Sequence, residues 1–487
     1  MARPRPLSGF PEWLPPARAV ERHLIGRLAR VFELHGFVEI ETRAVEPLSD
    51  LLRKGETSKE VYVLRRLQEV ERTGLDAKTL GLHFDLTVPL ARYVLQNAGQ
   101  LDFPFKRYQI QKVWRGERPQ EGRFREFVQA DLDVIGLGQL PFHYEVELPL
   151  IMAEALAQLG VGDFRVLVNN RKVAEGFYRL IGLEQPDQIG AVSRWIDKLD
   201  KVGPAGVAEG LAAEGLSPAQ VRAALDLAAI SGADPAAVVA SVRRLAAAVG
   251  AQAAADAAGP APDAAARDAS AGRALLDQGL AELGGLLEAA RRRAAAAVVA
   301  DLKIARGLDY YTGSVYETVW VGQESLGSVC SGGRYDSLAS VGGQTYPGVG
   351  LSIGVSRLVS RVLALGLLEP SRLTPAAVLV AVADEADRAT SDDAAARLRA
   401  RGIAAEVAPA AAKFGKQLKY ADKRGIPFVW FPGAADGGGD QVKDLRSGEQ
   451  TDADADVWRP PPADLEVGFG RPAAGVDAAT RIHSRAT

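Results

Sequence analysis

The sequence predicts a mixed α/β chain of several domains, and three stretches carry that prediction. Alternating polar and apolar residues at 105–115 and 124–135 predict two strands joined by a long loop. Alanine-rich, charged sequence at 172–299 predicts short helices. Strand-like and helix-like segments alternate over 377–431, which is typical of a small α/β domain. A length of 487 residues fits roughly two to four such domains.

The N-terminal elements follow from spacing and punctuation. Apolar residues recur at helical spacing from Pro15, and Gly36 is typical of the residue that ends a helix. Phe37–Thr42 predicts a short strand. The loop from Gly116 to Arg123 holds a proline, two glycines and four charged residues, so it predicts a long hairpin connection rather than a tight turn.

The later elements are predicted in the same way. The stretch 251–271 is close to low complexity, and we expect a mobile surface loop there. Glycine-rich strands return at 301–357. Prolines near 370–375 mark a boundary, after which we expect strands and helices in alternation, at 377–382, 385–401, 403–408, 413–424 and 426–431.

Composition limits the class of protein. Hydrophobic residues make up 47% and charged residues 24%, as in globular proteins, and the net charge of −3 shows no strongly basic surface in the total. A local basic patch for RNA stays possible. The single cysteine excludes an intrachain disulfide framework, and the five histidines lack metal-ligand spacing. Without an apolar run of about 18 residues we expect no membrane span and a cytoplasmic location.

The two long strands carry an unusual set of polar residues. Residues 101–126 hold seven Lys or Arg against four Asp or Glu, a local charge of +3. Alternation places two groups of polar residues each on one face of its strand: Gln109, Gln111 and Arg115 on the first, and Arg125, Gln129, Asp131 and Asp133 on the second. Two interpretations fit: a sheet with one wet face, or the polar floor of a binding site for an anionic partner.

Seven segments of the chain carry a resemblance to known sequence motifs. They are Phe10–Glu46, Trp114–Phe127, Arg306–Glu317, Cys330–Asp336, Gly348–Leu358, Lys416–Gly425 and Val442–Leu445. Together they resemble the histidyl-tRNA synthetases, a class II aminoacyl-tRNA synthetase family. Phe10–Glu46, Trp114–Phe127 and Gly348–Leu358 are similar to class II motifs 1, 2 and 3, Arg306–Glu317 and Cys330–Asp336 resemble two signatures of the histidine family, and the last two segments resemble its C-terminal anticodon-binding domain. The resemblance covers about 8–460 and is weakest across 172–299.

The resemblance implies a fold and a domain plan. The fold is a class II antiparallel sheet flanked by helices, with a helical insertion and a C-terminal α/β anticodon-binding domain. The implied bounds are 1–171 with 300–366 for the catalytic core, 172–299 for the insertion, 372–462 for the anticodon-binding domain, and 463–487 for a disordered tail.

The resemblance also implies a reaction. The carboxylate of histidine attacks the α-phosphate of ATP, in the company of Mg²⁺, to give histidyl-adenylate and pyrophosphate, and histidine then passes to the 3′ end of tRNA(His). Both steps build up charge that fixed cations and hydrogen-bond donors stabilise. The expected partners are L-histidine, ATP, tRNA(His) and a second copy of the chain in a homodimer built through motif 1, with no prosthetic group and no protein metal ligands.

Site roles carry over from the matching motifs. Arginine suits phosphate and carboxylate because its planar fork binds both in two places. Arg115 is expected at the α-phosphate and the amino-acid carboxylate, Arg357 at the γ-phosphate, and Arg123 near the nucleotide. Arg306 resembles the family's distinctive catalytic cation near the α-phosphate.

Histidine recognition is expected to use a different set of residues. Asp85 would pair with the α-ammonium, with hydrogen bonds from Thr87 and Gln129. Asp133 and Tyr311 would bind the imidazole nitrogens, and Tyr310 and Tyr335 would complete the pocket. For tRNA, Arg118 and Gln120 in the hairpin loop are the candidates at the acceptor end.

Other interpretations compete with these roles. The tyrosines could be ordinary core aromatics, Asp133 a solvated strand residue, and Cys330 a small buried hydrophobe. A non-catalytic paralogue, like the synthetase-like regulatory subunit of ATP phosphoribosyltransferase, is the main rival for the whole chain. Such paralogues usually lack the C-terminal domain and erode the catalytic arginines, which this sequence keeps. A synthetase for another amino acid and a pure RNA-binding protein are the remaining alternatives.

Overall fold

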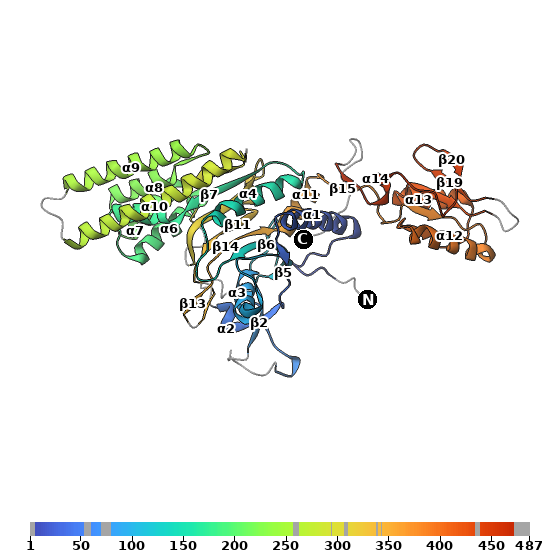
Figure 1. Ribbon diagram of the computed structural model, residues 1–487, viewed down its shortest axis with the longest axis horizontal. Coiled ribbons are helices and arrows are strands. Elements are labelled where there is room, and N and C mark those ends of the chain that lie inside the picture. The colour runs from blue at the N-terminus through green and yellow to red at the C-terminus, as the bar shows by residue number, and fades with distance from the viewer. Residues whose placement is uncertain are drawn as a thin grey trace. The chain divides into compact units, whose positions relative to one another are not determined.

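The computed structural model describes residues 5–52, 60–69, 79–256, 263–293, 295–305, 310–337, 339–341, 343–433 and 439–471. These residues form two compact units (Figure 1). The first contains the residues up to Pro11 together with Leu24–Arg361, and the second contains Glu12–His23 together with the residues from Val362 onward. Helices α1 (Pro15–Leu34) and α11 (Val355–Ala364) contribute residues to both units.

A nine-stranded sheet is the centre of the first unit. Its strand order is β1-β5-β6-β14-β11-β10-β7-β9-β8. The β1–β5 and β7–β9 pairs are parallel and the other pairs are antiparallel. The strands are β1 (Val38–Glu39), β5 (Phe105–Trp114), β6 (Glu126–Ile135), β7 (Phe164–Asn170), β8 (Ser231–Gly232), β9 (Val298–Asp301), β10 (Tyr311–Trp320), β11 (Cys330–Tyr335) and β14 (Gly348–Gly354).

Helices cover both faces of this sheet. Helix α4 (His143–Gln158) is apolar around most of its circumference and packs against β7 and β14, as expected for a helix buried on several sides. Helix α3 (Thr87–Asn97) places Leu90 and Val94 in one cluster with Phe105 and Tyr335 of the sheet. Since Arg334 pairs with Glu145 of α4 and neighbouring strand residues point to opposite faces, α3 and α4 lie on opposite sides.

Helices dominate the stretch between β7 and β9. They lie together beside the sheet (Figure 1). Helices α5 and α10 contact each other closely, because Gly176 and Gly279 leave no room for a side chain between them. The helices are α5 (Arg171–Leu180), α6 (Pro186–Ile196), α7 (Leu199–Ala213), α8 (Pro218–Ala228), α9 (Pro235–Asp256) and α10 (Asp263–Arg292).

Smaller elements complete the first unit. A three-stranded sheet in the order β2-β4-β3 and a β12–β13 pair lie outside the main sheet. Their bounds, with the adjoining helices, are β2 (Val45–Pro47), α2 (Leu48–Leu51), β3 (Val63–Leu64), η3 (Leu67–Glu69), β4 (Leu80–Leu82), η4 (Ala98–Gln100), η5 (Glu324–Leu326), β12 (Ser340–Val341) and β13 (Gln344–Thr345).

The second unit is built on a five-stranded sheet in the order β17-β16-β18-β19-β20. Two apolar clusters form its core: one contains Trp430 and Leu398, and the other Val429 and Ala421. Its elements are β15 (Glu369–Pro370), β16 (Val378–Val380), η6 (Glu385–Asp387), α12 (Arg388–Ala400), β17 (Ala405–Val407), α13 (Phe414–Arg424), β18 (Phe428–Phe431), β19 (Gln441–Asp444), β20 (Gln450–Asp452), α14 (Pro462–Leu465) and β21 (Phe469–Gly470).

The predicted fold class is confirmed, and three local expectations need correction. The expected surface loop at 251–271 is mostly helix, because alanine is the best helix former; residues 257–262 lie outside the described part. Residues 463–471, expected in a disordered tail, include most of α14 and strand β21, which pairs with β15. The expected strand Phe37–Thr42 is only two residues long.

Candidate active site

Strands β5, β6 and β14 carry a buried polar face. Strand register places Arg107 beside Asp133, Gln109 beside Asp131, and Gln111 beside Gln129. Residues opposite each other in a sheet point to the same face, so these six side chains share one face, as alternation predicted for Gln109, Gln111 and the β6 residues. The intervening Ala130, Leu132 and Val134 are fully buried toward the other face.

Asp133 is held from two sides. Its Oδ2 lies 2.7 Å from Nη2 of Arg107, whose side chain has no exposed surface. Its Oδ1 accepts a hydrogen bond of 2.7 Å from the hydroxyl of Tyr335 in β11. Asp133 and Tyr335 are both 3% exposed, so the solvated-strand interpretation of Asp133 is wrong. The carboxylate is instead a fixed acceptor inside the unit.

Glycines of β14 make the space for these groups. A Cβ at Gly350 would lie 1.9 Å from Oδ1 of Asp133, and a Cβ at Gly348 would lie 2.3 Å from the ring of Tyr335. Real Cβ atoms do not approach other atoms this closely. A side chain at Gly350 would therefore displace the Asp133 carboxylate, and one at Gly348 would displace the ring of Tyr335. The motif 3-like segment therefore contributes space as well as an arginine.

Tyr311 lies near this carboxylate, and Tyr310 packs against Tyr311. Their ring centroids are 4.3 Å apart, and Tyr311 pairs with Tyr335 across β10 and β11. Burial raises the pKa of Tyr311 well above its ordinary value, and the neighbouring Tyr310 and Tyr335 add to the shift. Burial and the adjacent Asp133 do the same for Tyr335. Both phenols therefore keep their protons at neutral pH and can donate or accept hydrogen bonds.

A second chain of polar contacts runs from Asp131 to Gln129. The hydroxyl of Ser352 in β14 donates to Oδ1 of Asp131, and Nε2 of Gln129 donates to the oxygen of Ser352. Asp131 is 2% exposed, and burial, opposed by Arg107, raises its pKa to about 7. Because Nε2 of Gln129 is engaged, its Oε1 is left as the acceptor, and this buried atom has no partner among the described residues.

Asp85 and Thr87 lie at the start of α3. Asp85 is 6% exposed, and its Oδ1 accepts a hydrogen bond of 3.1 Å from the backbone N–H of Val88. Its charge contributes to the raised pKa of Asp131, which places it near the polar face. Thr87 is half-buried. Neighbouring His83 is fully buried, and burial lowers its pKa, so its ring is neutral beside the carbonyl of Lys112.

The hairpin between β5 and β6 positions further arginines. Arg115 donates from Nε to the carbonyl of Phe84, 3.0 Å away, and its guanidinium lies 5.1 Å from the ring centre of Phe127. Arg123 lies 3.6 Å from Glu117 within the loop. Arg118 and Gln120 are exposed in this loop, which suits contact with a large partner rather than with a buried ligand.

Arg357 connects the start of α11 to the hairpin. Its Nε donates to the carbonyl of Gly122 at 3.1 Å, and its Nη1 donates to the carbonyl of Ser328. The structure thus brings Arg357 to the loop that also carries Arg123. Arg306, with Gly307, Leu308 and Asp309, lies outside the described residues, so its expected position rests on the resemblance.

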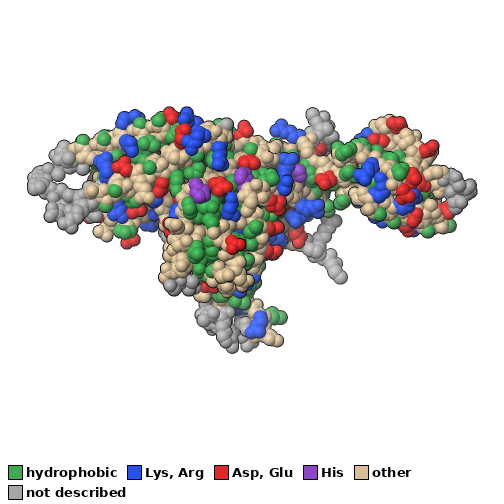
Figure 2. All heavy atoms as spheres, viewed as in Figure 1, with side chains coloured by type: hydrophobic (Ala, Val, Ile, Leu, Met, Phe, Trp, Pro, Cys, Tyr) green, Lys and Arg blue, Asp and Glu red, His purple; other side chains and the backbone are tan. Residues whose placement is uncertain are grey.

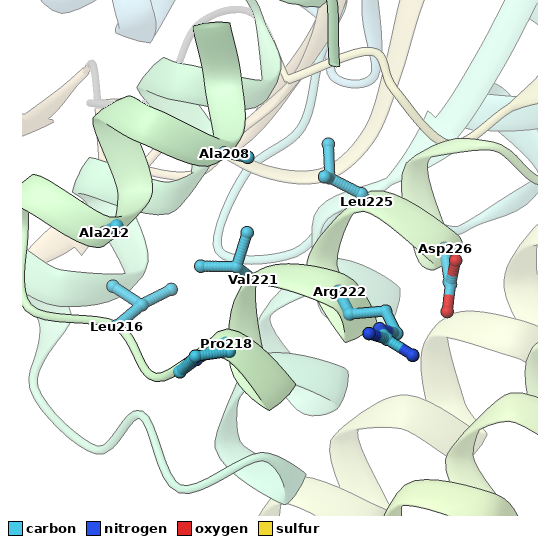
Figure 3. A pocket seen from close by; sticks show the side chains of 8 residues that line it. All are labelled: Ala208, Ala212, Leu216, Pro218, Val221, Arg222, Leu225 and Asp226. Carbon is cyan, nitrogen blue, oxygen red and sulfur yellow. The ribbon is translucent and has the colours of Figure 1, made fainter. Parts of the chain in front are cut away.

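A surface hollow also lies in the helical stretch between β7 and β9. A hollow of about 500 Å³ between α7 and α8 is lined mainly by apolar side chains such as Leu216, Val221 and Leu225 (Figure 3). On the face shown in Figure 2, acidic and basic side chains are intermixed, in keeping with the net charge of −3. Within the described ranges, no group of three or more His, Cys, Asp or Glu could hold a metal ion, and no helix could span a membrane.

Comparison with known proteins gives a consistent result. Residues 9–358 match the family model described as histidyl-tRNA synthetase, and residues 376–456 match an anticodon binding domain. The chain is 55% identical to a histidine--tRNA ligase of Micrococcus luteus, over 96% of this chain and 98% of that protein. A histidine--tRNA ligase of Cutibacterium acnes is 52% identical, over 96% and 99% of the two chains.

Solved structures agree. The crystal structure of histidyl-tRNA synthetase from Nostoc sp. matches with a TM-score of 0.78 and 35% identity, over 94% of this chain and 98% of that one. An ATP phosphoribosyltransferase regulatory subunit/histidyl-tRNA synthetase from Bacillus halodurans matches with a TM-score of 0.63 over 84% and 94%, but at 19% identity it shows the fold alone.

The fold and the sequence matches define an aminoacyl-tRNA synthetase, an ATP-dependent ligase. The family can also be stated, because its model covers residues 9–358 and relatives are more than half identical over nearly the full chain. The chain belongs to the histidyl-tRNA synthetase family.

Two residues of the site were not singled out from the sequence. Arg107 lies two residues before Gln109, so alternation alone would have placed it on the same face. Ser352 gave no signal of its own, since its role depends on the β6–β14 register, which pairs it with Asp131. Alternation within one strand does not predict its register with a strand that is distant in sequence.

Proposed function

We propose that this histidine–tRNA ligase activates histidine above the polar face of β5, β6 and β14. The observation that carries the proposal is the convergence of Asp133, Tyr311 and Tyr335 from three strands. A carboxylate accepts a hydrogen bond and a phenol can donate or accept one, so together they suit the two ring nitrogens of imidazole. A substrate without those nitrogens would leave buried polar groups unpaired, at about 1–3 kcal/mol each.

The α-ammonium of histidine would lie near Asp85, Thr87 and Gln129. Support comes from the orientation of the Gln129 amide, whose nitrogen is engaged by Ser352 and whose buried oxygen is left to accept. A nearly buried carboxylate at Asp85 adds the opposite charge. In this arrangement Tyr310 completes the apolar wall that α3 forms with the sheet.

The phosphates of ATP would lie on the hairpin side of the pocket. We assign Arg115 to the α-phosphate and the substrate carboxylate, Arg357 to the γ-phosphate, and Arg123 to the nucleotide. Arg115 and Arg357 are half-buried and each is oriented by a backbone carbonyl, which limits the reorganisation needed on binding. Arg306 is assigned to the α-phosphate on the resemblance of its segment.

Two displacements then follow. A carboxylate oxygen of histidine attacks the α-phosphorus, the bond to the bridging oxygen breaks, and pyrophosphate leaves. A hydroxyl at the 3′ end of tRNA next attacks the acyl carbon, its proton passes to a phosphate oxygen of the adenylate, and AMP leaves with the electron pair of the broken acyl–oxygen bond. Arginines stabilise the charge that develops at each centre. Mg²⁺ would enter as part of the nucleotide substrate, since phosphate oxygens and water can supply most of its ligands.

tRNA would contact both units. Arg118 and Gln120 in the exposed hairpin loop are our candidates at the acceptor end, and the domain at 372–462 is assigned to the anticodon. The proposal keeps a catalytic core at 1–171 and 300–366 and an insertion at 172–299. A homodimer built through Phe10–Glu46 and a cytoplasmic location, where tRNA is charged for translation, belong to the same proposal.

Amino-acid-dependent exchange of pyrophosphate into ATP tests the proposal. The purified chain should catalyse exchange with histidine and with no other standard amino acid. Exchange with a different amino acid, or none with histidine, would overturn it, and histidine binding without exchange would favour a regulatory subunit.

Arg306→Ala should abolish exchange while histidine binding persists. Arg292→Ala, in an exposed part of α10, is the matched control and should exchange normally. Loss of histidine binding in Arg306→Ala would contradict the role given to that arginine.

A further inference from the structure

A fully buried arginine lies beside the carboxylate that we propose binds the histidine ring. Arg107 in β5 has no exposed surface, and its Nη2 lies 2.7 Å from Oδ2 of Asp133. Its Nη1 donates to Oε1 of Gln109 at 3.3 Å, and its Nη2 lies 3.5 Å from the carbonyl of Leu86. The guanidinium therefore contacts both the polar face and the segment that begins α3.

An arginine is a poor choice if this position only fills space. Its guanidinium stays charged in proteins, and removing that charge from water is costly even when a partner is present. An apolar side chain of similar volume would usually stabilise the core as well or better. A positive charge at Arg107 therefore calls for a reason beyond packing, and its contacts point to the carboxylate of Asp133.

The contacts of Asp133 leave it little freedom. Oδ1 accepts from Tyr335, Oδ2 pairs with Arg107, and the absence of a side chain at Gly350 opens just enough space beside it. Each carboxylate oxygen can accept more than one hydrogen bond. With both oxygens anchored, the orientation of the carboxylate is fixed.

Resting on the function proposed above, we infer that Arg107 is a positioning residue for histidine selection. It holds the Asp133 carboxylate in the orientation that accepts an N–H from the imidazole ring. Lysine cannot replace it fully, because a single ammonium lacks the planar fork that reaches Asp133, Gln109 and Leu86 together. The same guanidinium also contacts Leu86, between Asp85 and Thr87. It therefore connects the residues proposed around the imidazole ring with those proposed around the α-ammonium of histidine.

The competing explanation is a purely structural ion pair. In that case, replacing Arg107 would lower stability or the folded fraction, but the folded enzyme would recognise histidine as before. The two explanations differ in the histidine KM and in the choice between histidine and a close analogue, which the folded fraction does not affect.

The test uses the full chain with Arg107→Lys and Arg107→Met, assayed by ATP–pyrophosphate exchange. Lys172→Met is the control, because it breaks a pair with Glu282 between α5 and α10 and removes none of the contacts made by Arg107 or Asp133. The probes are histidine and histidine methylated on a ring nitrogen, which lacks one possible N–H donor. The selectivity is the ratio of kcat/KM for histidine to that for the methylated form.

We expect the histidine KM to rise roughly tenfold in Arg107→Lys and roughly 100-fold in Arg107→Met, with the ATP KM changed by less than about threefold. Selectivity against the methylated form should fall by roughly tenfold in Arg107→Met and less in Arg107→Lys. The Lys172→Met control should keep both the histidine KM and the selectivity of the wild type.

Arg107→Lys keeps the charge and the approximate volume, so it decides the question if Arg107→Met does not fold. A wild-type histidine KM and selectivity in Arg107→Lys would overturn the inference, as would equal rises in the histidine and ATP KM values. Failure of the wild-type chain itself to exchange with histidine would count against the proposed function. The two failures are therefore distinguishable.

Discussion

Asp131→Asn should change how the stability of the first unit depends on pH. Asp131 is fully enclosed, and burial is the largest cause that raises its pKa from 3.8 to about 7. Nearby Asp133 and Asp85 raise it further, while Arg107 and the hydrogen bond from Ser352 act in the opposite direction. A folded state that binds this proton more tightly than the unfolded chain is stabilised by it.

The sign and size of the effect follow from that pKa. Because the folded value is the higher one, the stabilisation is complete below about pH 4 and is lost as the pH rises through about 7. A shift from 3.8 to about 7 corresponds to about 4 kcal/mol at 1.36 kcal/mol per pKa unit. About 3 kcal/mol of this lies between pH 5 and pH 8. Asparagine cannot ionise and does not have this dependence.

Unfolding of wild type and Asp131→Asn at about pH 5 and pH 8 measures the difference. We expect the variant to gain about 3 kcal/mol relative to the wild type between the two conditions, or roughly 5 °C in relative Tm. Asp163→Asn, at an exposed position before β7, should follow the wild type at both. A gap between variant and wild type that is the same at both pH values would refute the reasoning, because it would show that Asp131 does not take up a proton on folding in this range.

Three further predictions rest on single contacts. Gly350→Ala should raise the histidine KM by at least about tenfold, because the new methyl group would lie 1.9 Å from Asp133. Gly354→Ala is the control, because its methyl group would lie 3.6 Å from the nearest atom. If the two variants showed the same exchange kinetics, the proposed site would be contradicted. Glu145→Ala should lower the free energy of unfolding in urea by about 3 kcal/mol, since it leaves Arg334 without its buried partner. Glu147→Ala in the same helix breaks a more exposed pair and should lower it by less than about 1 kcal/mol. Burial raises the pKa of the Cys330 thiol, so a disulfide reagent should modify it only on unfolding; rapid modification of the native chain would show that β11 opens.

Much of the fold could be predicted because local patterns agree with the final packing. The apolar run at 377–382 contains β16, which is buried on both faces of its sheet. Gly36 predicted the end of α1 to within two residues. The error at 251–271 had a physical reason, since low complexity in alanine is also a strong helix signal. Strand β21 could not be predicted, because its two residues are ordered by pairing with Glu369 and Pro370.

The polar face shows where local patterns stop being informative. Period-two alternation correctly grouped Gln129, Asp131 and Asp133, because it depends only on one strand. The pairing of Asp133 with Arg107 depends on the β5–β6 register, and its space beneath Gly350 depends on the β6–β14 register. Neither register follows from the residues of a single strand. From the sequence alone, Asp133 could therefore still be interpreted as a solvated residue.

These registers connect stability to substrate choice. Arg107, Asp133 and Gly350 form one row across three strands, and a slip of one residue would turn each side chain to the opposite face. Apolar packing on both sides, from α3 through Leu90 and from α4, holds the row in place. Since Arg107 cannot lose its charge and Asp133 has no room to move, a slip would also separate a buried ion pair. The Arg107–Asp133 pair, which we assign to histidine selection, thus also destabilises sheets with a shifted register, in which the site would not form.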